Sequence, residues 1–146
     1  MNYTQSIKTK TTQRTSFLSI ATGIDKWWGK VDNPVSKVND EFSIFFGNTE
    51  WRFKIIEFLE YEKITWKCIK ANHIHQGLQN IKEEWFNSEL FWEFKTLKEF
   101  TEISFLHSGL NPELNCYDVC ESAWSFFITK SLKDYLDKGV GNPYFE

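Results

Sequence analysis

Apolar and polar residues alternate along the middle of the chain, which predicts an antiparallel sheet. A period of two is typical of strands that bury one face. We expect strands at residues 40–46, 51–60, 64–68, 88–97 and 101–107, with a short edge strand at 6–10. Gly47-Asn48 separates the first two and is typical of a two-residue hairpin loop. The adjacent pair Ile55-Ile56 interrupts the alternation and predicts a bulge.

The period becomes helical in the last third of the chain. From about residue 115 to 138, apolar side chains follow i, i+3, i+4 spacing, including Cys120, Trp124 and Leu136. Lysines near the C-terminal end match the helix dipole, and Gly139 suits the position after the last turn. Two shorter helices are expected near the N-terminus, at 13–20 and 22–29. Hairpin-connected strands followed by a long helix predict an α+β fold.

Composition indicates a folded domain rich in rings. The chain has 146 residues, enough for one domain spanning 1–146 with a real core, and 18% of them are aromatic. With 17 basic and 20 acidic residues and no basic block, the sequence argues against a nucleic-acid partner. The polar N-terminus and the lack of a long apolar run argue against export or a membrane partner. Three cysteines, an odd number, favour a reducing, cytoplasmic compartment.

Several short motifs occur in a characteristic order. They are KWWG at 26–29, ITWKC at 64–68, EW at 84–85, FLHSGL at 105–110, CYDVCESAW at 116–124 and SLKDYLDKGVGNP at 131–143. Together they resemble the START-like, helix-grip superfamily, also called SRPBCC. The most similar branch is that of homologues of the activator of the heat-shock-protein-90 ATPase. The resemblance covers about residues 22–143.

The resemblance implies a curved antiparallel sheet around the long C-terminal helix, with an apolar cavity between them. Members of the superfamily bind or transform hydrophobic small molecules such as lipids, polyketides and aromatic compounds. The superfamily has no common catalytic triad that could be transferred to this chain. Single-domain bacterial members resemble only one domain of the eukaryotic co-chaperone, so activity on a chaperone does not follow.

Strand parity and the resemblance together predict a ligand-binding wall. Its residues are Trp28, Phe53, Trp66, Trp92, Phe105, His107, Tyr117, Cys120 and Trp124. An aromatic wall with a few polar groups is typical of small-molecule sites. The alternative is a solid core packed with the same rings. His107 is either a polar contact for a ligand, an acid–base group near neutral pH, or a structural histidine bonded within the protein.

Cys116 and Cys120 share one helical face near the helix N-terminus, where the dipole lowers thiol pKa values. With His107 they suggest a metal site or a redox pair. However, C-x3-C is not a usual zinc spacing and a second ligand pair is missing, which favours reduced, partly buried thiols. His73 and His75 are expected in a solvated loop, and Glu83-Glu84 in a solvated turn. Asp118 and Glu121 are explained by helix capping.

The sequence therefore predicts a cytoplasmic module that holds a small apolar molecule, with no metal or cofactor. It would act as a monomer or as a weak homodimer through an edge strand. The first alternative is a cyclase- or hydrolase-like enzyme that uses His107. The second is a protein-interaction domain resembling the chaperone activator, which would need an exposed apolar patch near Trp27 and Trp28.

Overall fold

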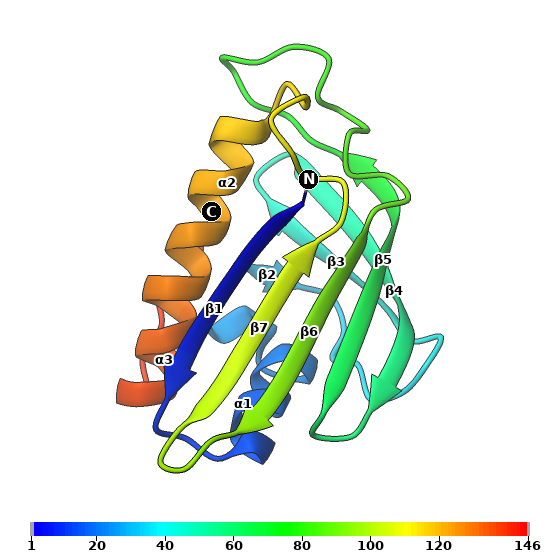
Figure 1. Cartoon of the computed structure of the whole chain (residues 1–146). Helices are drawn as coiled ribbons and strands as arrows, with labels where there is room; N and C mark the ends of the chain where they lie inside the picture. The colour runs from blue at the N-terminus through cyan, green and yellow to red at the C-terminus, as the bar shows by residue number, and fades with distance from the viewer. Residues whose placement is uncertain (1, 146) are drawn as a thin grey trace.

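A seven-stranded antiparallel sheet curves around a C-terminal helix in the computed structural model, which describes residues 2–145 (Figure 1). Its strands are β1 (Tyr3–Thr9), β2 (Lys30–Val31), β3 (Glu41–Phe46), β4 (Thr49–Leu59), β5 (Lys63–Asn72), β6 (Glu89–Thr96) and β7 (Thr101–His107). The helical elements are α1 (Gln13–Ala21), the 3₁₀ turn η1 (Ile24–Lys26), α2 (Tyr117–Phe126), the π-helical η2 (Phe127–Leu132) and α3 (Lys133–Lys138). This arrangement confirms the predicted α+β helix-grip architecture.

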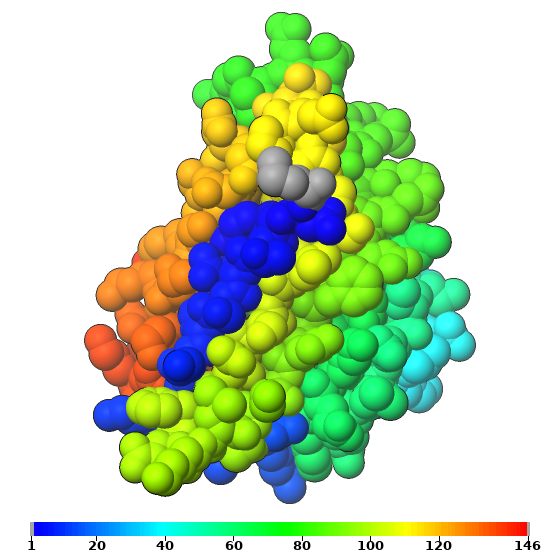
Figure 2. Space-filling model, in the orientation of Figure 1, coloured from blue at the N-terminus to red at the C-terminus, as the bar shows by residue number. Residues whose placement is uncertain are grey.

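The sheet has the strand order β1-β7-β6-β5-β4-β3-β2, so the first strand pairs with the last. Tyr3 lies opposite His107 and Thr9 lies opposite Thr101. Figure 2 shows β1 between β7 and the C-terminal helix. The Tyr3 hydroxyl is 2.9 Å from Ser125 Oγ, so the two can share a hydrogen bond that ties this edge strand to the helix.

The segments α2, η2 and α3 follow one another without interruption and form one long helical rod. Trp124, Ile128 and Leu132 on its inner face are fully buried, as their spacing predicts. Within η2, the Ser131 hydroxyl donates to the Trp27 carbonyl (2.6 Å) and accepts from the Asn142 amide (2.7 Å). The rod ends at Gly139, whose φ of 85° is the left-handed conformation expected after a last turn.

Strand β4 carries the predicted irregularity. Its pairing with β5 shifts register between Ile55 and Glu57, which confirms the bulge expected at Ile55-Ile56. A second shift lies between Arg52 and Phe53 and was not predicted. The predicted hairpin is also present, with Phe46 opposite Thr49 and a two-residue loop between them.

The second predicted helix near the N-terminus is wrong in extent. Only the single 3₁₀ turn Ile24–Lys26 forms, and the chain then enters the short strand β2, a region expected to be a loop from Val31. Gly29 does not end a helix but lies where the backbone meets the C-terminal tail at Tyr144. A Cβ atom at this position would be 3.0 Å from the Phe46 ring, so glycine permits the close approach.

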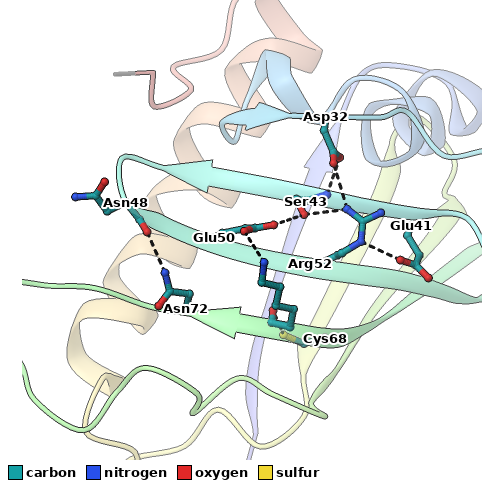
Figure 3. A network of polar contacts seen from close by, with 9 residues as sticks. Asp32, Glu41, Ser43, Asn48, Glu50, Arg52, Cys68 and Asn72 are labelled. Atoms are coloured by element: carbon teal, nitrogen blue, oxygen red, sulfur yellow. Dashed lines mark hydrogen bonds and ion pairs between the residues drawn. The ribbon is translucent and has the colours of Figure 1, made fainter.

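The outer face of β3, β4 and β5 is polar (Figure 3). Arg52 donates to Glu41 (2.9 Å) and Asp32 (3.1 Å), while Glu50 accepts from Ser43 (2.7 Å) and Lys70 (3.0 Å). The Ser43 bond is the main cause of the lowered pKa of Glu50. Because these side chains alternate with buried rings, the sheet presents charge outward and aromatic surface to the helix.

Candidate functional site

The centre of the space between sheet and helix is filled by aromatic rings. Trp92 from β6 packs on Phe105 from β7, with ring centroids 4.3 Å apart. Trp28 stacks on Trp124 of the helix at 4.8 Å. Trp66 and Trp92 are fully buried. At this level the sheet and the helix meet through solid packing, so any open space has to lie elsewhere.

A cavity of about 190 Å³ opens where β5 ends and the helical rod begins. The indole of Trp51 stacks on that of Trp85 with centroids 4.0 Å apart, and Trp85 lies parallel to Trp124 at 5.8 Å. The lining consists of Trp28, Phe46, Thr49, Trp51, His73, Ile74, His75, Trp85, Val119, Cys120, Ala123, Trp124 and Phe127. Four indoles and two histidines give it an apolar wall with few polar atoms.

The segment between β5 and β6 closes one side of this cavity. In Figure 1 it rises beyond the sheet and passes beside the start of α2. Thr49 Oγ1 accepts from the Ile74 amide (2.9 Å) and donates to the Ile74 carbonyl (3.1 Å), which fixes the segment to β4. The His73 amide donates to the Lys82 carbonyl (3.0 Å). The two ends of the segment are therefore held over the sheet.

Glu84 joins this segment to the helical rod. Its carboxylate accepts hydrogen bonds from the backbone amides of Asn115 (2.8 Å) and Cys116 (2.9 Å). These amides stand at the start of α2, where N–H groups lack partners within the helix. Cys116, the N-cap residue, makes no side-chain cap bond of its own. A carboxylate from another segment thus performs the capping and leaves the Cys116 thiol free for other contacts.

His107 is enclosed in the core at the end of β7. The Trp124 indole N–H donates to its Nδ1 (3.2 Å), and its Nε2 is 2.9 Å from Ser88 Oγ. Since Nδ1 accepts and the Ser88 hydroxyl donates to the Trp85 carbonyl (2.6 Å), the neutral Nε2–H tautomer fits both contacts. Burial lowers the pKa of His107 to about 3. At neutral pH it is an uncharged structural group with both ring nitrogens engaged.

His73, Cys116 and Cys120 form a buried cluster beside the cavity. One imidazole nitrogen and the two Sγ atoms all lie within 4.8 Å of one another. A Cys116 thiolate would accept a hydrogen bond from the Cys120 thiol, which lowers the pKa of Cys116, and His73 lowers it further. The same contact raises the pKa of Cys120.

The structure separates the nine predicted ligand-binding residues into groups. Trp28, Cys120 and Trp124 line the cavity. Tyr117 is half-buried in the first turn of α2. The other five lie in the core at 2% exposure or less: Phe53, Trp66, Trp92, Phe105 and His107.

Sequence reasoning missed Trp51 and Trp85, whose stacked rings form one wall of the cavity, and the clustering of His73 with the thiols. His73 was expected in a solvated loop, but only 7% of it is exposed, so that prediction was wrong. Glu84 was likewise expected to be solvated, but it caps α2. The one signal in the sequence was the i, i+4 spacing of the cysteines, which identified two of the three residues of the cluster.

No family model and no curated protein sequence matches the chain. Solved structures do. The Aha1 dimer from Colwellia psychrerythraea superimposes with a TM-score of 0.78 at 22% identity, covering 97% of this chain and 99% of that one. The chain has the START-like helix-grip fold. The predicted likeness of its fold to the ATPase-activator branch is thereby confirmed.

Two further helix-grip structures agree with this result. Protein SSP2350 from Staphylococcus saprophyticus matches with a TM-score of 0.74 at 12% identity, over 99% of this chain and 98% of that one. DynU16, a protein from the dynemicin biosynthetic locus, matches with a TM-score of 0.73 at 10% identity. That match covers 96% of this chain and 48% of DynU16. At these identities the similarity establishes the fold.

Proposed function

We propose that this helix-grip protein binds a small apolar or aromatic molecule in the cavity beside Trp51, Trp85 and Trp124. The observation that carries the proposal is the cavity itself, which four indole rings surround at the open end of an otherwise solid interior. Its volume of about 190 Å³ is below the roughly 300–1,000 Å³ typical of drug-sized ligands. A single-ring aromatic compound or a short acyl chain fits this size.

The polar groups of the cavity support a weakly polar ligand. His73 and Cys120 reach the lining. The buried indole N–H groups of Trp51, Trp66, Trp85 and Trp92 have no hydrogen-bond partner within residues 2–145, and of these four residues Trp51 and Trp85 border the cavity. Unpaired buried donors are costly, and an acceptor group on a ligand would satisfy them. The family that the sequence motifs resemble also handles hydrophobic small molecules, which agrees with the proposal.

The two alternative functions receive less support. An enzyme that uses His107 would need its imidazole to reach a substrate, but both ring nitrogens are engaged inside the core. A docking surface at Trp27 and Trp28 would need exposed indoles, and both residues are at 2% exposure or less. Binding without an assigned reaction is therefore the function we propose.

We also propose a reducing compartment as the setting of this function. Cys68, Cys116 and Cys120 are free and buried. Within residues 2–145 no helix is long and apolar enough to cross a membrane. We propose that the chain acts as one cytoplasmic START-like domain, as a monomer or a weak homodimer.

Native mass spectrometry of the gently purified protein, followed by extraction, would identify a retained ligand. Addition of single-ring aromatics and short fatty acids should then shift the indole N–H NMR signals of the cavity residues Trp28, Trp51, Trp85 and Trp124. The residues Trp27, Trp66 and Trp92 do not line the cavity, so their indole N–H signals provide an internal control. Equal shifts in all seven signals, or none in any, would contradict binding at this site.

A substitution at the cavity rim provides the matched test. Ala123 is exposed and lines the cavity from α2, so Ala123→Phe should block it without disturbing the core. We expect at least a tenfold loss of affinity, or about 1.4 kcal/mol. Ser122→Phe places the same ring on the preceding residue, which is also exposed but does not line the cavity. This variant should bind the ligand with the affinity of the wild type. Equal affinity of the two variants would refute the proposed location.

A further inference from the structure

The cluster of His73, Cys116 and Cys120 combines a donor set and a degree of burial that a ligand pocket for apolar molecules does not need. The three residues are at 7%, 0% and 3% exposure. His73 directly follows β5, Cys116 is the N-cap residue of α2 and Cys120 lies in its first turn, so distant parts of the sequence meet here. Nδ1 of His73 is buried and has no hydrogen-bond partner among the residues that the structure describes. A buried imidazole nitrogen without a partner calls for a ligand.

The geometry fits a metal ion that prefers sulfur and nitrogen. Tetrahedral Zn²⁺ with bonds of about 2.3 Å to sulfur and about 2.0 Å to nitrogen places its ligand atoms roughly 3.5–3.8 Å apart. The three donor atoms already lie within 4.8 Å of one another. Small side-chain rotations would bring them to the required spacing. Two thiolates would balance the charge of the dication, which suits a buried centre.

The surroundings hold the ligands in place. Glu84 takes over the capping of α2 through the amides of Asn115 and Cys116, so that the Cys116 thiol is not needed as a cap. The His73 ring packs on Trp51, with centroids 4.8 Å apart, and its amide bonds to Lys82. Rigid placement of the first ligands and their supports is what metal sites require.

We propose that His73, Cys116 and Cys120 bind one Zn²⁺ ion, with the fourth position open to the aromatic cavity. Within residues 2–145 no fourth His, Cys, Asp or Glu belongs to the cluster. His73 and Cys120 both line the cavity, so the open side of the site faces it. Three protein ligands and one exchangeable position are the arrangement of catalytic rather than structural zinc sites. Binding releases the two thiol protons.

The test uses the full chain, reduced with a phosphine, stripped with a chelator and titrated with ZnCl₂ against a chromophoric competitor. We expect one Zn²⁺ per chain. Titration with CoCl₂ should produce thiolate-to-cobalt charge-transfer absorption and the visible bands of a tetrahedral ion. If the fourth position is open, added thiocyanate should change the visible bands; an unchanged spectrum would overturn that part of the proposal.

Single substitutions assign the ligands. Cys116→Ser and Cys120→Ser should each abolish or halve the charge-transfer band of the Co²⁺ protein. His73→Ala should weaken Zn²⁺ binding by more than the roughly 10–100-fold in affinity that is lost when a residue that only supports a metal ligand is removed. Gln76→Ala changes an exposed residue of the same loop that does not line the cavity, and it should leave Zn²⁺ binding unchanged. Undiminished affinity in His73→Ala, or Zn²⁺ retained by the double cysteine variant, would overturn the assignment.

Two measurements on the unmodified protein keep the test valid if a variant fails to fold. Zn²⁺ should raise the melting temperature of the wild type, by an amount that grows with the logarithm of the free Zn²⁺ concentration relative to Kd. It should also shift the ¹⁵N signals of the His73 ring and leave those of His107 in place. Folded, reduced protein with three free thiols and no bound Zn²⁺ would overturn the site. A Cys116–Cys120 disulfide in the protein as isolated would identify a redox pair instead.

Discussion

The two ends of the space between sheet and helix differ in what fills them. At the centre and toward α1, rings such as Trp27, Trp66 and Trp92 fill the space against one another. Toward the start of α2, the rings leave a cavity between them, which is also bordered by the side chains of His73 and Cys120. The solid end has the composition of a stabilising core, and the open end has that of a binding site.

This contrast separates two uses of the same residue type. Trp92 is enclosed by neighbouring rings, whereas Trp85 has one face against Trp51 and lines the cavity. Aromatic content alone therefore does not locate a ligand site in this fold. A ring that borders the cavity beside His73 and Cys120 is available to a ligand, whereas a ring enclosed by other rings supports the fold.

The largest expected effect is at the solid end. Trp92→Ala should lower the free energy of unfolding by about 3–5 kcal/mol, because it removes a fully buried ring and leaves a cavity. Phe127→Ala, a half-buried ring at the cavity rim, should cost about half as much, since part of its surface is already exposed. Urea denaturation of both variants provides the comparison. Equal losses would show that the two ends do not differ in packing.

The second prediction concerns acid stability. His107 has a pKa of about 3 in the folded protein, against about 6.5 when unfolded. Below pH 6.5 the unfolded chain binds a proton that the folded chain does not, so stability falls as the pH decreases toward 3 and is unaffected above that window. The loss between pH 7.5 and pH 5 should be about 2 kcal/mol from this residue.

Replacement of the imidazole isolates this contribution from those of the carboxylates. His107→Gln lowers stability at all pH values but should reduce the loss between pH 7.5 and pH 5 by that amount. His75→Gln, in the exposed loop, should follow the wild-type profile and serves as the control. If the His107→Gln profile is parallel to that of wild type, the core does not keep His107 neutral.

The smallest predicted effect tests the support of the open end. Glu84→Gln retains one acceptor oxygen and turns an amide group toward the other backbone N–H, so one capping bond at Asn115 or Cys116 is lost. The cost should be about 1 kcal/mol, as for loss of a helix cap. Glu83→Gln, its exposed neighbour, should cost nothing measurable. A loss of equal size in both would mean that general charge, and not capping, is responsible.

The periodic parts of the sequence predicted the fold because periodicity reports burial. Alternation located the strands from Glu41 to His107, and helical spacing located the C-terminal rod. The site was predicted only in part, because residues 73–88 have no period and their partners lie far along the chain. The contact of His73 with Cys116 and Cys120 depends on how this segment folds back over the sheet. Strand parity also cannot distinguish a ring that packs from one that borders a void.

The pairing of β1 with β7 has a consequence for how the protein is made. Most of the chain separates Tyr3 from its partner His107, so β1 cannot join the sheet until β7 has left the ribosome. Contacts this distant in sequence slow folding, because a long loop must close before they form. Until then, β7 has an unpaired edge that another nascent chain could occupy. Pairing of β1 with β7 removes this exposed edge, and with it a site at which newly synthesised chains could aggregate.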